Sequence, residues 1–74
     1  MSTQLENSEQ LVKVLIKRRK EIGMSQIELS KLCDLSINGI SKFESSAGAR
    51  EVKLSTLFKL GKVLGFKINL EFEE

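Results

Sequence analysis

Three polar side chains within residues 36–44 have the chemistry needed to recognise the edges of base pairs. Asn38 carries an amide, Ser41 a hydroxyl and Lys42 an ammonium group. In the major groove of B-DNA an amide can bond adenine N6 and N7 together, an ammonium can reach guanine O6 or N7, and a hydroxyl can serve several bases. At about 100° per residue the three share one helix face, with Ile37 at its border, where it could touch a thymine methyl. The pattern predicts a base-reading helix.

Such a helix needs a second face that fixes it to the rest of the protein. Ser36 can cap its start. Ile40, Phe43 and Glu44 gather on the side opposite the polar face. We therefore expect a helix from the Ser36 cap to about Glu44, with one face built for a core and the other for solvent or a ligand.

A shorter helix is predicted directly before it. Ser25 and Glu28 form the S-x-x-E pattern of a capping box. The apolar stripe of this helix consists of Leu29, Leu32 and Cys33. Asp34 and Leu35 then interrupt the pattern, and aspartate tolerates a left-handed turn better than most residues other than glycine. The two segments predict a helix-turn-helix whose second helix lies across the first.

Two longer helices are expected on either side. The first runs from Ser8 to Ile22, capped by Asn7 or Ser8 and ended by Gly23. One face of this helix carries Leu11, Leu15, Arg19 and Ile22, flanked by Val12, Val14 and Ile16. After a loop, SSAGAR, helical periodicity returns from Leu54 to Leu64. Its apolar positions are Leu54, Leu57, Phe58, Leu60, Val63 and Leu64, and Gly65 ends it.

The last segment changes to a period of two residues, which is typical of a half-buried strand. Its apolar positions are Phe66, Ile68, Leu70 and Phe72. No other segment resembles a strand, and a lone strand leaves its backbone groups unpaired. We predict a homodimer in which two copies of this strand pair antiparallel about a two-fold axis. The alternative is a tail that packs on its own helices.

The charge is distributed unevenly along the 74 residues. All twelve Lys and Arg lie between Gln10 and Lys67, against five acidic residues, so this span has a net charge of +7. The other acidic residues are Glu6, Glu9, Glu71, Glu73 and Glu74. A basic body with acidic ends is compatible with nucleic-acid binding. The alternative is a solvated helix face, and the basic run at residues 17–20 does not decide between them.

The composition argues against an enzyme or a metal protein. The chain has no His, the usual general base and commonest metal ligand. The single cysteine, Cys33, cannot form an internal disulfide, and we expect it to be a small core residue rather than a redox switch. No apolar run approaches a membrane span and no signal peptide is recognisable, so a reduced cytoplasmic location is expected. We expect no cofactor and no catalytic residues.

The stretch MSQIELSKLCDLSINGISKFESS resembles the helix-turn-helix of the Cro/C1-type (XRE) DNA-binding domains. Ser25, Gln26, Leu29 and Ser30 match the start of that motif, and Ile40 and Glu44 match its recognition helix. The resemblance extends from about residue 11 to residue 64. It implies an all-α, lambda-repressor-like bundle of four to five helices. Residues 1–7 would be a flexible arm, residues 8–65 the DNA-binding domain, and residues 66–74 the dimerisation strand and acidic tail.

The resemblance also implies roles for particular residues. Gln26 would meet a phosphate and brace the recognition helix, while Arg19 and Glu44 would form an internal ion pair that holds the fold. The residues expected to face bases or nearby phosphates are Ser36, Ile37, Asn38, Ser41 and Lys42. Those expected to approach the backbone are Ser45, Ser46 and Arg50. Asp34 stands where the family usually has Gly, and Ile27 is apolar where a polar residue is usual, which hints at a protein partner.

The predicted strand at LGFKINL resembles the C-terminal dimer strand of HipB-type antitoxins. This implies a sequence-specific repressor that binds a palindromic double-stranded DNA operator as a homodimer and belongs to a toxin–antitoxin operon. One alternative is a protein whose main role is to restrain a HipA-like kinase toxin. Another is a phage-type or restriction–modification controller that has no toxin partner.

Overall fold

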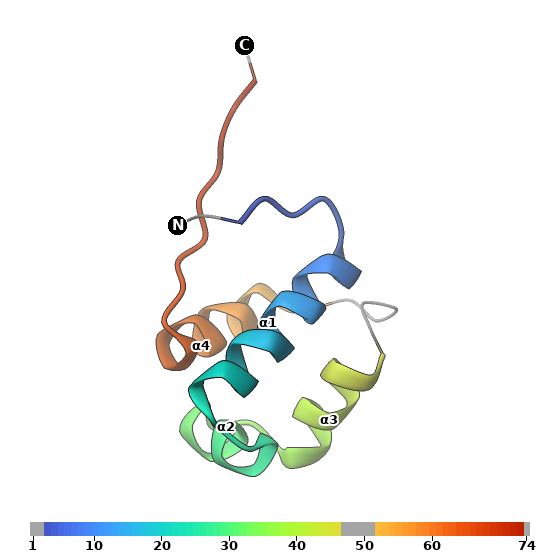
Figure 1. Cartoon of the computed structure of the whole chain (residues 1–74), viewed down its shortest axis with the longest axis vertical. Coiled ribbons are helices and arrows are strands. Elements are labelled where there is room, and N and C mark those ends of the chain that lie inside the picture. The colour runs from blue at the N-terminus through green and yellow to red at the C-terminus, as the bar shows by residue number, and fades with distance from the viewer. Residues whose placement is uncertain (1–2, 47–51, 74) are drawn as a thin grey trace.

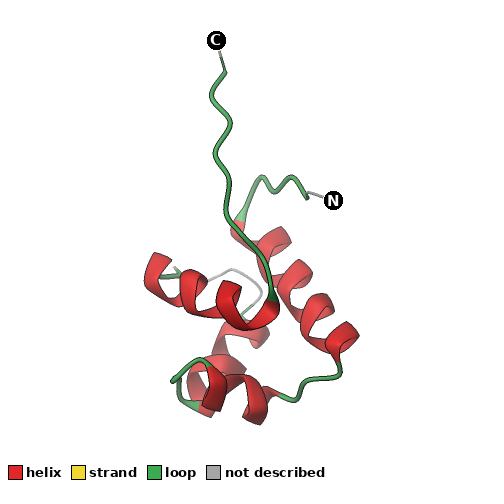
Figure 2. Cartoon of the chain, turned by 90° about the vertical axis from the view of Figure 1, so that its left-hand side faces the viewer, coloured by secondary structure: helices red, strands yellow, loops and turns green. Residues whose placement is uncertain are grey.

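Four helices make up the body of the protein in the computed structural model, which describes residues 3–46 and 52–73. They are α1 (Ser8–Ile22), α2 (Gln26–Leu32), α3 (Ile37–Ser45) and α4 (Leu54–Leu64) (Figure 1). The four predicted helices are confirmed, each within about one residue at either end. Over the two described ranges the chain contains no strand (Figure 2).

The helix ends follow from local hydrogen bonding. Asn7 caps α1, where its Oδ1 accepts from the Gln10 N–H at 2.9 Å, and Gly23 ends α1 in the left-handed conformation with φ +80°. Ser25 and Glu28 form the predicted capping box: the Ser25 N–H donates to Glu28 Oε1 at 3.1 Å, and the Glu28 N–H donates to Ser25 Oγ at 3.0 Å. These side chains satisfy backbone donors that a helix start leaves free.

The turn between α2 and α3 depends on Asp34. This residue has φ +54°, in the left-handed region that favours glycine. Ser36 then caps α3, because its Oγ accepts from the Gly39 N–H at 2.9 Å. Asp34 therefore adopts the left-handed conformation that this turn needs, at a conformational cost that glycine would not have.

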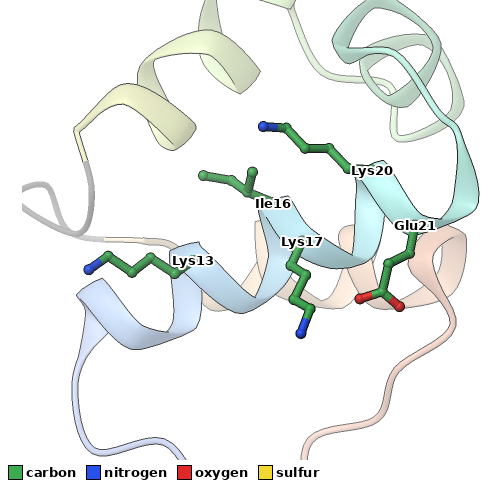
Figure 3. A pocket seen from close by; sticks show the side chains of 5 residues that line it. All are labelled: Lys13, Ile16, Lys17, Lys20 and Glu21. Atoms are coloured by element: carbon green, nitrogen blue, oxygen red, sulfur yellow. The ribbon is translucent and has the colours of Figure 1, made fainter.

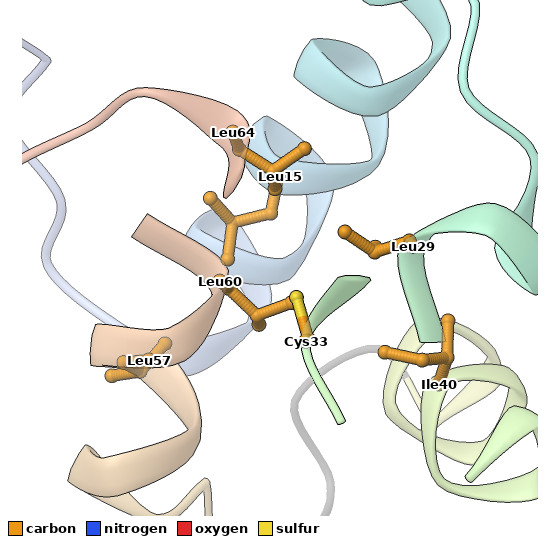
Figure 4. Close-up of a cluster of buried hydrophobic side chains, with 7 residues drawn as sticks. All are labelled: Leu15, Leu29, Cys33, Ile40, Leu57, Leu60 and Leu64. Atoms are coloured by element: carbon orange, nitrogen blue, oxygen red, sulfur yellow. The ribbon is translucent and has the colours of Figure 1, made fainter. Parts of the chain in front are cut away.

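One apolar core joins all four helices. Its buried side chains are Leu15, Leu29, Cys33, Ile40, Leu57, Leu60 and Leu64 (Figure 4). Burial raises the pKa of the Cys33 thiol, and the nearby Lys59 charge only partly offsets it. The thiol is therefore neutral at pH 7 and behaves as a small apolar side chain.

In α1 and α2 the buried face is rotated relative to the apolar face that the sequence predicted. In α1 the buried residues are Val12, Leu15 and Arg19, while Ile22, on the last helical position, is exposed. In α2 Ser30 is buried instead of Leu32, which is 63% exposed. At about 100° per residue, positions 30 and 32 lie about 80° to either side of the centre of Leu29 and Cys33, and the buried arc is shifted toward position 30. Ser30 tolerates burial because its hydroxyl donates to the Ile27 carbonyl at 2.7 Å.

The C-terminal segment begins against α4 and then leaves the body. The Phe66 N–H donates to the Gly61 carbonyl at 3.0 Å, and a β-carbon at Gly61 would lie 2.9 Å from the Phe66 carbonyl oxygen. Beyond this contact the apolar positions Ile68, Leu70 and Phe72 are exposed. The strand and its pairing are not shown by a single chain and stay predictions.

The two ends of the described chain project from the side of the body opposite α2 and α3, as both views show (Figures 1 and 2). Principal extents of 42 × 25 × 20 Å reflect this projecting tail. Of the helices described, none combines the length and apolarity that crossing a membrane would require.

Candidate nucleic-acid interface

The outward face of α3 carries the predicted base-reading side chains. Asn38, Ser41 and Lys42 are all exposed, whereas Ile40 on the opposite face is only 1% exposed. Over residues 3–46 and 52–73, no other group forms a hydrogen bond or ion pair with these three side chains. Their amide, hydroxyl and ammonium groups are therefore available to an external partner.

Ile37 extends this face at the start of α3. Its side chain is 42% exposed, so it presents apolar surface beside Asn38. Ser36 is exposed as well, but its Oγ already accepts the capping hydrogen bond from Gly39. The Ser36 hydroxyl keeps its own hydrogen, so it can still donate to a phosphate or base acceptor.

The side chains of Ser45 and Ser46, at the end of α3, form local hydrogen bonds. Ser45 Oγ donates to the Lys42 carbonyl at 3.5 Å, and Ser46 Oγ donates to the Phe43 carbonyl at 3.3 Å. Both bonds are long for an O–H donor, so little energy opposes their exchange for a phosphate oxygen. Arg50, which was also expected to approach the backbone, lies outside the described residues.

One carboxylate connects the three helices behind this face; we name Arg19, Gln26 and Glu44 together the Glu44 hub. Arg19 Nε donates to Glu44 Oε2 at 2.7 Å, and Arg19 Nη2 donates to Glu44 Oε1 at 2.8 Å. Gln26 Nε2 donates to the same Oε1 at 2.9 Å. This two-pronged ion pair leaves each of its side chains only 10% exposed.

Arg19 makes three hydrogen bonds inside the protein. Its third hydrogen bond goes from Nη1 to the Met24 carbonyl at 2.8 Å, and the residue is 8% exposed. The guanidinium is therefore a link within the fold rather than a surface for DNA. Sequence reasoning identified the Arg19–Glu44 pair, but it missed Met24, because a backbone carbonyl leaves no signal in side-chain types.

Glu44 is ionised at neutral pH. Burial by itself would raise the pKa of this carboxyl, but hydrogen bonds from Arg19 and Gln26, with the charges of Arg19 and Lys20, outweigh burial and hold the pKa below its ordinary value. The hub is thus a charged assembly, and its hydrogen bonds are of the stronger, charge-assisted kind.

Gln26 lies at the junction between the hub and the surface. It is the first residue of α2 and is partly exposed, so it can face a phosphate near a helix N-terminus, where the helix dipole favours negative charge. One amide N–H is committed to Glu44, and the amide keeps a second N–H. The position of Gln26 is compatible with both roles that the resemblance implies for it, which stay predictions.

Comparison with known proteins agrees with this arrangement. Residues 15–70, well over half of the chain, match the family model described as Helix-turn-helix. A search of curated proteins found no match.

Proposed function

The chain belongs to the XRE-type helix-turn-helix family, whose members are DNA-binding transcription regulators, and from this premise we propose that it is a sequence-specific repressor. The observation that carries the proposal is the outward face of α3. Asn38, Ser41 and Lys42 have no partner over the described ranges, and Ile40 anchors the other side of the same helix. Their groups match the donor and acceptor pattern of base edges in the major groove.

In the proposed complex α3 enters a major groove about 12 Å wide. Asn38 and Lys42 would contact base edges, Ser41 would donate to or accept from a base, and Ile37 would meet a thymine methyl. Gln26, Ser36, Ser45 and Ser46 would contact phosphates, which position the protein without reading sequence. Phosphate contacts would also make the affinity dependent on salt.

We further propose that the regulator acts as a homodimer. Ile68, Leu70 and Phe72 alternate along the tail and are exposed, the last two at 79% and 86%. Contact of this much apolar surface with water is unfavourable for a single chain. Pairing with the same segment of a second copy would cover them and satisfy the backbone groups of both strands.

The direction of the tail supports this form of dimer. The segment leaves the body on the side opposite α2 and α3, so its pairing would leave both base-reading faces open (Figure 2). Leu54 and Phe58, on the helix that leads into the tail, are also more than half exposed and add apolar surface. A two-fold dimer would bind a palindrome with half-sites about 34–36 Å apart.

A second candidate function is favoured by exposed apolar surface on two sides of α2. Ile27 is 56% exposed and Leu32 is 63% exposed, which is more apolar surface than DNA contact requires. A HipB-like antitoxin that restrains a HipA-like kinase toxin would use such a surface for its protein partner. Co-purification with the product of an adjacent gene would support this function, whereas a phage-type or restriction–modification controller would bind DNA and retain no such partner.

Selection of bound sequences from a random pool of duplex DNA with the purified protein tests the main proposal. We expect enrichment of an inverted repeat whose half-sites are separated by about one helical turn. The variant carrying both Asn38→Ala and Lys42→Ala is the control and should enrich no common sequence. Failure of the unmodified, folded protein to enrich any motif would contradict DNA reading, and an asymmetric single half-site would contradict the dimer.

A further inference from the structure

The guanidinium of Arg18 lies where the tail, residues 66–73, leaves the body. Arg18 Nε donates to the Leu64 carbonyl at 3.0 Å, at the end of α4. Its Nη2 lies 3.5 Å from the position that a β-carbon would have at Gly65. Within residues 3–46 and 52–73 this exposed side chain forms no other hydrogen bond and no ion pair. Its positive charge and remaining N–H donors are therefore available at the base of the tail.

Other charges near this point nearly cancel. Lys17 and Glu21 extend from α1 on the side on which the tail leaves the body, and they are of opposite sign (Figure 3). The carbonyl end of α4 is negative because of the helix dipole. Arg18 offsets this end of the dipole, as does Lys62 in the last turn. A carboxylate can therefore approach the end of α4, and the Arg18 guanidinium can bind it.

The charged residues of the tail are too far apart to pair with one another. Lys67, Glu71 and Glu73 are exposed, and none of them forms an ion pair in the part of the chain that the structure describes. In a strand four residues span about 13 Å, so Lys67 cannot reach Glu71 of its own tail. The end of the tail, which carries Glu73, projects away from the body (Figure 1). A second copy can supply the opposite charges.

One register of two antiparallel tails matches both the apolar and the charged positions. In this register the two-fold axis passes between the two copies of Asn69. Opposite residues are then Phe66 and Phe72, Ile68 and Leu70, and Lys67 and Glu71. Their β-carbons would lie about 4.5–5.5 Å apart, which is close enough for an ion pair and for apolar contact. All four apolar positions of each tail are paired with apolar positions of the other.

Other registers that keep the apolar faces together are less favourable. With the axis at residue 68 or residue 70, one phenylalanine of each tail has no apolar partner in the other tail. With the axis at Lys67 or Glu71, like charges stand directly opposite each other, which is destabilising. The residue pattern of the tail therefore favours the axis at Asn69.

We propose that the exposed guanidinium of Arg18 binds Glu73 of a second copy, which pairing of the tails about Asn69 brings to the base of the first tail. The inference rests on the proposed homodimer and deepens it by naming the register and a contact outside the strands. In this register Glu73 comes opposite Gly65, which has no side chain and beside which the Arg18 guanidinium lies. Guanidinium and carboxylate form charge-assisted hydrogen bonds, and the two-fold axis makes the contact occur twice.

A mixture of two charge-reversed variants tests the contact. Arg18→Glu brings like charges together in its own homodimer, and so does Glu73→Arg, whereas a heterodimer of the two variants has both attractive contacts. Each exposed pair changes affinity by about 1.4- to 5-fold, and the comparison with both homodimers involves four contacts. Native mass spectrometry at about 50 mM ammonium acetate should therefore show at least about fourfold more heterodimer than the statistical ratio. The excess should decrease at about 500 mM.

This readout separates the contact from a purely structural role of Arg18. Loss of its bond to Leu64 would affect the homodimer and the heterodimer of Arg18→Glu alike, so it would produce no excess. Lys59→Glu, an equal charge change at an exposed position of α4, is the control and should give the statistical ratio with Glu73→Arg. Statistical ratios in both mixtures, or equal excesses in both, would overturn the contact.

Oxidation of single cysteines in the tail tests the register. A residue on the two-fold axis stands opposite itself, so Asn69→Cys should form a disulfide-linked dimer faster than Ile68→Cys or Leu70→Cys. The unmodified protein is the control, because Cys33 is buried. Faster coupling at either neighbour would overturn the register and the Arg18 contact while leaving the homodimer intact. A monomeric unmodified protein in sedimentation equilibrium would overturn the proposed homodimer together with this inference.

Discussion

Gln26 Nε2 lies 2.9 Å from Glu44 Oε1, so the first residue of α2 is hydrogen-bonded to the last turn of α3. The same carboxylate accepts from Arg19 of α1. Apolar packing tolerates small shifts of one helix along another. Hydrogen bonds from several donors to one carboxylate restrict the relative positions of the helices more tightly, because each bond needs a defined direction. The orientation of the base-reading face relative to α2 is therefore fixed by polar geometry as well as by the core.

Removal of the hub carboxylate should be strongly destabilising. Glu44→Ala leaves Arg19, a residue only 8% exposed in the unmodified protein, without its charge partner. We expect the free energy of unfolding to fall by about 3–5 kcal/mol, the cost of breaking a well-buried pair. Urea unfolding followed by circular dichroism measures this change. Glu21→Ala, at an exposed position of α1, should stay within about 0.5 kcal/mol, and an equal effect of the two substitutions would contradict the buried pair.

The free energy of unfolding should also depend on pH through the Glu44 carboxyl. Hydrogen bonds and charges lower the pKa of Glu44 in the folded protein in spite of burial, which acts to raise it. Its stabilising contribution is fully present above the unfolded pKa of about 4.3 and is lost as pH falls through the lower folded value. Urea midpoints measured between about pH 7 and pH 3 should therefore decline more steeply for the unmodified protein than for Glu44→Gln. Parallel profiles would show that another carboxyl controls the acid response.

Two substitutions on the outward face should separate binding from folding. Asn38→Ala and Lys42→Ala remove exposed side chains that have no partner over the described ranges, so the free energy of unfolding should change by less than about 0.5 kcal/mol. Each should weaken binding to the selected duplex by about 1–3 kcal/mol. Anisotropy titrations on the selected and shuffled duplexes measure this loss. Lys59→Ala on α4 is the control, and unchanged affinity of the α3 variants would remove the basis for base reading.

Gly61 should be intolerant of a side chain although it lies within a helix. A β-carbon there would lie 2.9 Å from the Phe66 carbonyl oxygen and 3.2 Å from Phe66 Cε1. The backbone oxygen cannot rotate away, so the overpacking cost of about 1–3 kcal/mol should exceed the gain of at most about 1 kcal/mol from better helix propensity. Gly61→Ala should thus lower the urea midpoint, whereas Ser55→Ala, exposed on the same helix, should not. A stabilised Gly61→Ala would show that the tail does not pack here.

The exposed face of the tail should control assembly. Leu70→Ser and Phe72→Ser remove the two most exposed apolar side chains of the tail, so they should raise the dimer dissociation constant by at least about tenfold while helix content stays the same. Sedimentation equilibrium measures this constant. Asn69→Ser, on an alternate position, is the control. Dissociation constants unaffected by the apolar substitutions would locate the interface elsewhere.

The helix positions were predictable because capping residues mark them locally. Asn7, Ser25, Ser36 and the glycines at 23 and 65 all act at the ends that the sequence assigned to them. The buried face of each helix was harder to predict, because an apolar stripe does not determine which of its two edges contacts the neighbouring helix. Leu32 and Ile22 are exposed for this reason, and Ser30 is buried because a local hydrogen bond satisfies its hydroxyl.

The candidate site was predictable to different degrees. The polar face of α3 follows from helical spacing alone, and the structure places Asn38, Ser41 and Lys42 together at the surface. In residues 17–20, Arg18 bonds the Leu64 carbonyl and Arg19 bonds Glu44, whereas the two lysines have no ion-pair partner in the part of the chain that the structure describes. This division was not predictable, because it depends on how α1 meets α3 and α4. The pairing of the tail could not be derived from the sequence either, since a period of two residues predicts a strand but does not identify what that strand pairs with.

The placement of both ends of the described chain on the side away from α3 has a practical consequence for tools based on this protein (Figure 1). A dye, enzyme or activation domain attached at the amino end would stand clear of bound nucleic acid and would not block the groove. Attachment close behind Phe72 would instead crowd the surface proposed to join two copies. Amino-terminal fusions are accordingly the better choice for reporters of promoter occupancy.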